Sequence, residues 1–448
     1  MREKRTVQSS IFHFFADHEI GRELQAISNW LDSHPEILEL VAADIQEVKV
    51  NDCGRKGLPV ESVLRCAILK QYRQVSYEEL AFYLLDSHSF QAFARLPLEI
   101  IPRKAVLQRT ISRISDVTWE KINQALLRHA KAAGVERGQV IRLDSTATDS
   151  NIHEPSDSSL LWDGVRVLTQ LFEQARELSG GGSLPCRNHC RRAKRRMCSI
   201  RHTRGRDKKA ALYQDLIQVT RMRLSYIDPV YQILAGLLVD PASCAVWLTE
   251  VEHYRGLIER VIEQTERRVF HGEKVPAREK IFSLFEEHTD IIVKGSRDIQ
   301  YGHKLNLMTG QSGLVLDVMI EAGNPADTER FLPMLDRHIQ HYGKAPRQMA
   351  VDGGYASKDN LKEAKAKGVK DMAFHKKKGL KVKEMAKSDW VYRKLRNFRA
   401  GIEAGISHLK RCFGLRRCNW KGLEHFKAYV WSAVVTHNLV TLARLKPA

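Results

Sequence analysis

The sequence is short of the features that mark secreted and membrane proteins. Cysteine is scarce, with 8 in 448 residues, and the spacing is not that of a disulfide framework, so we expect a reducing compartment. The best apolar stretch, 428–445, is interrupted by His437, Asn438 and Arg444, which argues against a membrane-spanning helix. Met1 is followed by charged and polar residues, which predicts no secretory signal. These absences predict a cytoplasmic protein without a membrane partner.

Acidic residues are also in deficit. The chain has 72 Lys and Arg against 53 Asp and Glu, a formal net charge of +19 at pH 7. This excess favours a polyanionic partner, and nucleic acid is the one that we expect. The hydrophobic share of 43% is enough for buried cores and excludes a wholly disordered chain. A length of 448 residues allows two or three domains.

The first 125 or so residues have a helical pattern. Residues 59–86 alternate apolar stripes and charges at helical spacing, and Ser76 with Glu79 is the signature of a capping box that opens a second helix. A further helical segment spans 104–115. Short helices with tight turns in a basic protein indicate a helix-turn-helix-like DNA-binding domain at 1–130, although a plain helical bundle fits the pattern equally well.

From about residue 139 the pattern becomes that of a mixed α/β domain, expected over 138–448. Strands are predicted at 140–144, 290–293, 303–308, 314–320, 370–374 and in a run that ends at Asp352. Helices are predicted at 327–342, at 357–367 and in a long C-terminal segment. A mostly helical, basic insertion at about 158–287, with a glycine-rich loop at 180–182, interrupts this domain.

The insertion holds the largest block of positive charge. Residues 187–209 contain eleven Lys and Arg and one acid, Asp207, a density that favours a surface for DNA phosphates. The arginines expected to contact DNA there are Arg191, Arg192, Arg195 and Arg196. The same block has five potential zinc ligands, Cys186, His189, Cys190, Cys198 and His202. Their spacing matches no common zinc finger well, so a basic loop that contains cysteines is favoured over a zinc site.

Two acids follow apolar strand patterns. Asp144 comes after Val-Ile-Arg-Leu, and Asp352 comes after Met-Ala-Val and precedes Gly353-Gly354. A carboxylate at the end of a buried strand can reach a cleft, where converging carboxylates hold the Mg²⁺ of phosphoryl-transfer sites. The alternative for either acid is a simple cap on the next turn.

A third acid lies in a segment that is otherwise basic. Residues 391–420 contain eight Lys and Arg and a single acid, Glu403. On a helix, Arg396, Arg399, Glu403 and Lys410 share one face, beside an apolar stripe that would pack on the sheet. Eight cations need more than one anion, so part of the negative charge should come from outside the chain. A metal-ligating Glu403 in a phosphate-binding face fits both observations, whereas a surface ion pair explains only the first.

Asp144, Asp352 and Glu403, on strand, strand and helix in this order, resemble the DDE triad of bacterial insertion-sequence transposases. In one branch the third motif reads Tyr, two residues, Arg, three residues, Glu, six residues, Lys. Arg399, Glu403 and Lys410 match this spacing, and Arg396 occupies the Tyr position. The segments 144–153 and 301–304 also resemble this branch, in particular its ISNCY-type group, and residues 57–113 resemble its N-terminal DNA-binding domain.

The resemblance implies an RNase H-like catalytic domain and a metal-dependent reaction. Two Mg²⁺, with Mn²⁺ able to substitute, would be held by Asp144, Asp352 and Glu403, with Asp144 bridging both. The enzyme would hydrolyse the phosphodiester at each transposon end and transfer the freed 3′-OH to target DNA. Arg396, Arg399 and Lys410 would lie on the DNA face. The partners implied are double-stranded DNA, as terminal inverted repeats and target, and a second copy in a homodimer, at the bacterial nucleoid.

Two alternatives remain open at this stage. One is another RNase H-like endonuclease or resolvase that shares the metal site without strand transfer. The other is a catalytically silent DNA-binding protein derived from a transposase, against which the intact Asp, Asp, Glu set argues.

Overall fold

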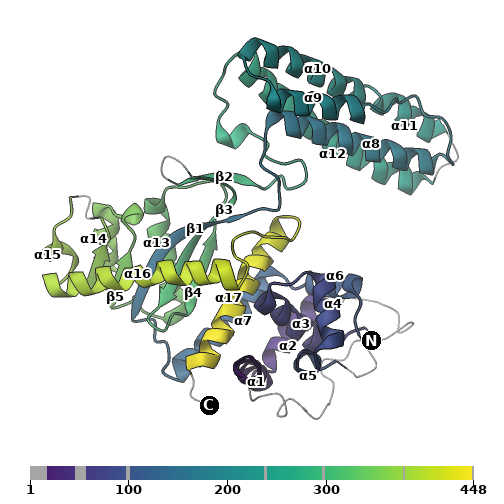
Figure 1. Cartoon of the computed structure of the whole chain (residues 1–448). Helices are drawn as coiled ribbons and strands as arrows, with labels where there is room; N and C mark the ends of the chain where they lie inside the picture. The colour runs from purple at the N-terminus through teal and green to yellow at the C-terminus, as the bar shows by residue number, and fades with distance from the viewer. Residues whose placement is uncertain are drawn as a thin grey trace. The chain divides into compact units, whose positions relative to one another are not determined.

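The computed structural model describes residues 18–45, 57–96, 101–236, 240–294, 298–376 and 379–445 (Figure 1). These residues form two compact units. The first combines the chain up to Asn151 with the chain from Gly302 onward, and the second is the intervening segment from Ile152 to Tyr301. The division at about residue 130 between a DNA-binding and a catalytic domain therefore falls inside the first unit and stays a prediction.

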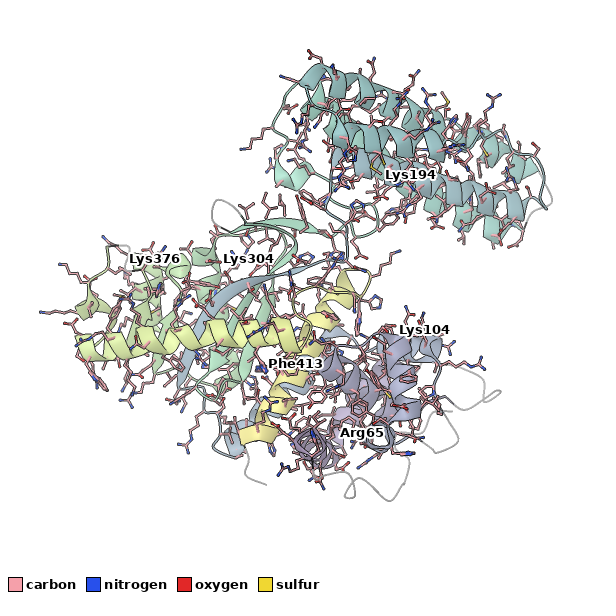
Figure 2. The ribbon with its side chains drawn as sticks, in the orientation of Figure 1. Arg65, Lys104, Lys194, Lys304, Lys376 and Phe413 are labelled. Carbon is pink, nitrogen blue, oxygen red and sulfur yellow. The ribbon has the colours of Figure 1, made fainter. Side chains whose placement is uncertain are left out.

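The N-terminal part of the first unit is all helical. Its helices are α1 Glu19–Asp32, α2 Glu36–Ile45, α3 Val60–Arg73, α4 Tyr77–Asp86, α5 His88–Ala94, α6 Lys104–Ile111 and α7 Asp116–Ala132. The predicted capping box forms, since Ser76 and Glu79 bond each other's backbone N–H groups at the start of α4. Arg65, fully buried among these helices (Figure 2), is held at 3.0 Å by both Glu61 and Asp32. Such pairing is what a buried cation requires.

The sheet of the first unit is mixed. Its strands are β1 Val140–Asp149, β3 Asp298–Gly310, β4 Val315–Ile320, β5 Gln348–Val351 and β6 Asp371–Phe374. The first residues of β3 and the whole of β2 Asp290–Lys294, which pairs with β3, belong to the second unit. The order is β2-β3-β1-β5-β6, and β4 also pairs with β3. β1 is antiparallel to β3 and parallel to β5, which is parallel to β6.

One strand prediction needs correction. β1 does not end at Asp144, as the sequence pattern suggested, but continues to Asp149, because β3 pairs with it from Ile141 to Asp149. Asp144 is nevertheless at the end of a pairing, since the parallel partner β5 stops opposite Leu143.

Helices cover this sheet. They are α13 Asp327–Tyr342, the short η3 Gly353–Tyr355, α14 Lys358–Ala366, α15 Val382–Met385, α16 Asp389–Cys412 and α17 Leu423–Leu445. α16 packs on β1, β5 and β6, and the predicted apolar stripe is buried, with Leu395, Ile402 and Leu409 at most 2% exposed. α17 contacts α7, α3 and α1, which explains why it is apolar on nearly all sides: a helix surrounded by protein has little polar face.

The second unit is a helical bundle with its own hydrophobic core. Its helices are α8 Asp157–Leu178, α9 Cys190–His202, α10 Arg206–Leu224, α11 Ile227–Gly236, α12 Pro241–Val269 and the short η2 Ala277–Glu279. Gly180 to Gly182 form the predicted loop. The sequence analysis favoured a loop for the basic block, and this is wrong for residues 190–202. They form helix α9, whose Ala193 and Ile200 are buried.

The architecture agrees with the predicted fold class: a mixed α/β domain interrupted by a mostly helical insertion and preceded by an all-α N-terminal part. In the described part of the chain, no helix is long and apolar enough to span a membrane.

Candidate active site

The register of two strands brings Asp144 and Asp352 together. Leu143 is paired with Val351 at the last step of the parallel ladder, and the N–H of Asp352 donates to the carbonyl of Leu143 at 3.1 Å. The acids that follow these two residues therefore leave neighbouring strands at the same level of the sheet. Asp352 is also a cap, because its Oδ2 accepts from the N–H of Gly354 at 3.0 Å. The cap therefore does not exclude the predicted role of Asp352 in a site, which the sequence presented as the alternative.

Helix α16 adds Arg399 and Glu403 to this pair of acids. The Nη2 atom of Arg399 is 3.1 Å from Asp144 Oδ2, 3.1 Å from Asp352 Oδ1 and 2.9 Å from Glu403 Oε1. The three acids predicted to form the triad thus meet at one guanidinium nitrogen. A single Nη atom has two protons, and its hydrogen bonds go to Asp144 and Glu403, while Asp352 faces the same nitrogen as an ion pair.

The four side chains of this cluster differ in exposure. Arg399 is 9% exposed, Asp144 13%, Asp352 30% and Glu403 63%. The Nε of Arg399 is buried and has no hydrogen-bond partner within the described residues. The deep side of the cluster is therefore fixed by the sheet, and the outer carboxylate, Glu403, reaches solvent.

Arg142 on β1 forms hydrogen bonds with both α16 and β3 beside the triad. It donates from Nη1 to the carbonyl of Phe398 at 3.2 Å and from Nη2 to the carbonyl of Gly310 at 3.3 Å. A Cβ on Gly401 would lie 1.9 Å from the Nη1 of Arg142, so any larger residue at this position would force the guanidinium of Arg142 to move. We did not predict Arg142 from the sequence, although its position two residues before Asp144 places both side chains on one face of β1.

A second group of polar residues supports the triad strands. Lys304 Nζ lies 2.5 Å from Asp327 Oδ1, and Ser145, which follows Asp144, contacts the same carboxylate at 3.4 Å. A Cβ on Gly354 would lie 2.4 Å from Asp327 Oδ2, so Asp327 fills the space that this glycine leaves. Burial, followed by the charges of Asp327 and Asp144, raises the pKa of Tyr355 well above its usual value. Lys304 and Ser145 were noted in the sequence, in the motifs 301–304 and 144–153, whereas no role was predicted for Asp327 or Tyr355.

The donor set fits a hard divalent cation. Carboxylate oxygens are the ligands that Mg²⁺ prefers, at about 2.0–2.1 Å. Because each oxygen lies within 3.1 Å of one nitrogen, any two are at most about 6 Å apart. In the described part of the chain, no three His, Cys, Asp or Glu side chains are arranged to hold a metal as they stand. The carboxylates therefore suit Mg²⁺ only after Arg399 has moved aside, and no zinc arrangement forms around Cys186 and His202.

The residues predicted to contact DNA fall into two groups. Arg396 is exposed on α16, and Lys410 is half-buried two turns beyond Glu403. Arg191, Arg192, Arg195 and Arg196 all lie on α9 of the second unit. Arg192 and Arg196 share the carboxylate of Asp215 on α10, so part of their charge is neutralised within the protein.

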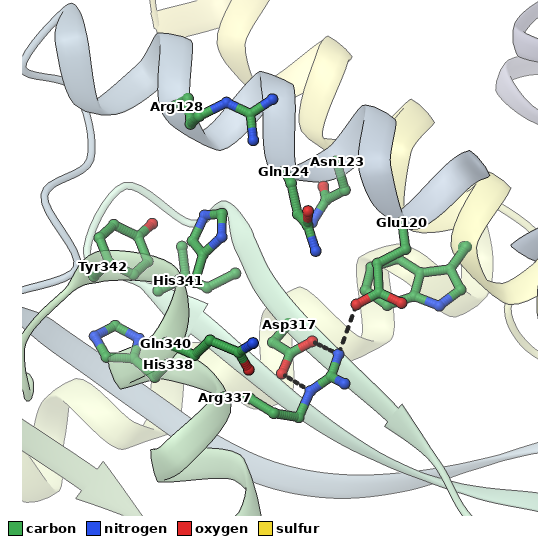
Figure 3. A pocket seen from close by; sticks show the side chains of 12 residues that line it. Glu120, Asn123, Gln124, Arg128, Asp317, Arg337, His338, Gln340, His341 and Tyr342 are labelled. Carbon is green, nitrogen blue, oxygen red and sulfur yellow. Dashed lines mark hydrogen bonds and ion pairs between the residues drawn. The ribbon is translucent and has the colours of Figure 1, made fainter. Parts of the chain in front are cut away.

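A cavity of about 470 Å³ elsewhere in the first unit is lined by α7, β4 and α13 (Figure 3). None of the triad residues lines it. Arg337 crosses one side, bonded to Asp317 at 2.6 and 2.7 Å and to Glu120 at 2.9 Å. Burial lowers the pKa of His338, another lining residue, to about 4. Two acids thus hold Arg337 at the side of the cavity, and none of the residues predicted for the site lies there.

Two family models match the chain. Residues 294–439 match the "Transposase DDE domain" and residues 13–114 match the "Transposase domain (DUF772)". The first match includes Asp352, Arg399 and Glu403, whereas Asp144 lies before it. No curated protein and no solved structure matches the chain. These matches confirm the resemblance predicted from the sequence: the two regions are similar to transposase domains, and the C-terminal one to a DDE domain.

Proposed function

We propose that the chain is a DNA transposase that hydrolyses a phosphodiester at each transposon end and joins the freed 3′-OH to target DNA. The observation that carries this proposal is the convergence of Asp144, Asp352 and Glu403 within 3.1 Å of one nitrogen, in a chain with a transposase DDE match. Transposases act on DNA and those of the DDE type use divalent metal ions; the reaction sequence is our inference.

The three carboxylates would hold Mg²⁺, two ions by our proposal. Mg²⁺, or Mn²⁺ in its place, would lower the pKa of a bound water and neutralise charge on the phosphate. Asp144 and Asp352 are positioned by the sheet, which suits residues that must keep their geometry. Glu403 is exposed and belongs to a helix, so its side chain can turn from Arg399 toward a metal.

The cations of the same helix have a complementary role. Arg399, once released from the carboxylates, and Lys410 would hold phosphates near the scissile bond, while the exposed Arg396 would contact DNA further along α16. The arginines of α9 would bind duplex DNA without regard to sequence, because phosphate contacts position a duplex and do not read it. We propose a homodimer on a pair of transposon ends, which the mass of the protein–DNA complex would measure.

The test is cleavage of a labelled duplex that carries the terminal inverted repeat beside the gene. We expect cleavage with Mg²⁺ and none with chelator. Asp144→Asn, Asp352→Asn and Glu403→Gln should each reduce cleavage by several orders of magnitude and leave DNA binding largely intact, since metal-bound carboxylates act as a unit. Glu363→Gln, on the exposed face of α14, is the matched control and should cleave normally.

The outcomes separate the alternatives. Cleavage without joining to target DNA would favour an endonuclease or resolvase. DNA binding without cleavage under any metal would favour a catalytically silent derivative. Normal cleavage by Glu403→Gln would mean that another acid completes the site.

A further inference from the structure

A basic pocket of about 460 Å³ lies between α3 and the turn that follows α16, near Phe413 in Figure 2. Of its ten lining residues, all in the described part of the chain, five are cations and none is acidic. The cations of the basic pocket are Lys70, Lys410, Arg411, Arg416 and Arg417. The acid whose charge acts on three of them is Asp149, at the end of β1. The charge of Glu79 acts on a fourth, Lys70, so both acids lie outside a lining whose charges are all positive.

The pocket is built by hydrogen bonds that join α3 to the end of α16. Gln71 donates from Nε2 to the carbonyl of Phe413 at 2.5 Å, and Gln74 donates from Nε2 to that of Arg411 at 2.6 Å. Gln74 ends α3 with φ of 52°, a left-handed conformation that is uncommon for a residue other than glycine. The end of β1 is tied to the same turn, since the N–H of Cys418 donates to the carbonyl of Asp149 at 2.8 Å. The cations are thus held on a rigid frame connected to the strand of Asp144.

Lys70 is the feature that points to a ligand. Its side chain is buried, with the residue 4% exposed, and lines the pocket. Its ammonium faces the rings of Tyr77 at 4.8 Å and Trp420 at 5.8 Å and has no ion pair within the described residues. The charge of Glu79 acts on this ammonium without a direct ion pair, and a buried ammonium with no carboxylate in contact is costly. An anion in the pocket would supply the missing charge.

We propose that the basic pocket binds a backbone phosphate of the DNA, so that α3 and the end of α16 contact the duplex at the same phosphate. This inference rests on the proposed function, which supplies the DNA. Lys410 is seven residues beyond Glu403, about 10 Å along the helix at 1.5 Å per residue. One strand of DNA rises about 3.4 Å per nucleotide. The phosphate in the pocket would therefore belong to the same stretch of duplex as the one at the triad.

The pocket's role is to hold the strand at a fixed distance from the carboxylates. Contacts of this kind position the nucleic acid and carry no sequence information. Lys70 belongs to the N-terminal helices and Lys410 to α16, so one phosphate would connect the part of the chain expected to bind DNA with the part expected to cut it.

The test is the salt dependence of binding to a blunt duplex of arbitrary sequence, measured in chelator so that cleavage plays no part. Lys70→Met keeps the length of the side chain and removes its charge, and Arg416→Gln changes an exposed residue that the fold does not depend on. Each should flatten the slope of log K against log salt by about 0.9, the value for one phosphate contact. The control is Lys367→Met, which removes a cation at the end of α14 that is paired with Asp336 on α13. It should leave the slope unchanged.

Unchanged slopes in both pocket variants, with a wild-type protein that binds steeply, would overturn the pocket and leave the proposed function standing. A wild-type protein that does not bind duplex DNA would instead overturn the proposed function. If Lys70→Met lowers the melting temperature, Arg416→Gln alone decides the matter, because it tests the same phosphate from the exposed rim.

Discussion

Arg399 stands where the three carboxylates meet, so replacing it separates its structural from its functional contribution. Arg399→Met keeps an unbranched apolar stem and removes the guanidinium. Breaking a buried ion pair costs about 3–5 kcal/mol. Asp352 and Glu403 are 30% and 63% exposed and rehydrate, so we expect a loss of about 1–3 kcal/mol in the free energy of unfolding.

Mg²⁺ should reverse this loss. In the wild-type protein the ion must displace the guanidinium from oxygens 2.9–3.1 Å away, whereas in Arg399→Met the carboxylates lose this guanidinium and repel one another. We therefore expect Mg²⁺ to bind the DNA-free variant at least about tenfold more tightly than the wild type, a difference of about 1.4 kcal/mol. Mg²⁺ should also raise the melting temperature of the variant more than that of the wild type.

Thermal melting and calorimetric titration with Mg²⁺, both without DNA, measure the two effects. Arg396→Met is the matched control, because Arg396 is exposed one turn earlier on α16 and should change neither quantity. The reasoning fails if Arg399→Met binds Mg²⁺ no more tightly than the wild type and melts lower whether or not Mg²⁺ is present. Arg399 would then be a structural residue outside the metal position.

Three further predictions concern other parts of the chain. Gly405→Ala on α16, where nothing lies within 4 Å of the new Cβ, should stabilise the protein by about 0.5–1 kcal/mol through helix propensity. Gly401→Ala on the same helix should destabilise it by about 1–3 kcal/mol, because Arg142 must move. The melting temperatures of the two variants test both expectations. Neutralising Arg191 with Arg195 should flatten the salt dependence of DNA binding more than neutralising Arg192 with Arg196, which share Asp215; equal slopes would contradict the assignment. Burial lowers the pKa of Lys70 to about 8, so its charged form is complete below that pH and is lost above it; DNA binding should weaken above about pH 8 in the wild type but not in Lys70→Met. The groups that face Lys70 are Tyr77, Glu79, Cys418, Tyr429 and the four other cations of the basic pocket. Burial raises the pKa of Tyr77 and of Tyr429 well above this range, so neither phenol accounts for the change, and binding constants measured across it at fixed salt decide.

Local signals predicted much of the fold because they depend on residues close in sequence. Ser76 and Glu79 are three residues apart and form the capping box that their types require. Arg399 and Glu403 are four residues apart, so a helix alone places them side by side. The extension of β1 to Asp149 was missed because Ser145, Thr146 and Thr148 are polar. They form a strand through pairing with β3, and pairing is not a local property.

Contacts between distant segments set what could not be predicted. That Asp144 and Asp352 share Arg399 depends on the Leu143–Val351 register and on where α16 crosses the sheet. The basic pocket requires α3 to lie against the end of α16, more than three hundred residues later in the chain. The sequence showed the cations of 391–420, but it had no feature that placed Lys70 with Arg416.

Arg399 has different partners in the free protein and in the proposed complex with DNA and Mg²⁺. With neither metal nor DNA, its charge offsets three carboxylates that otherwise repel, so the chain can fold with the triad already assembled. Because it belongs to the same helix as Glu403, four residues earlier, it cannot leave the site and can only turn its side chain. Its buried Nε has no partner within the described residues, and a phosphate oxygen could accept from it. DNA would thus give Arg399 a new partner and free the carboxylates, so DNA and Mg²⁺ should each increase the affinity for the other by the same factor.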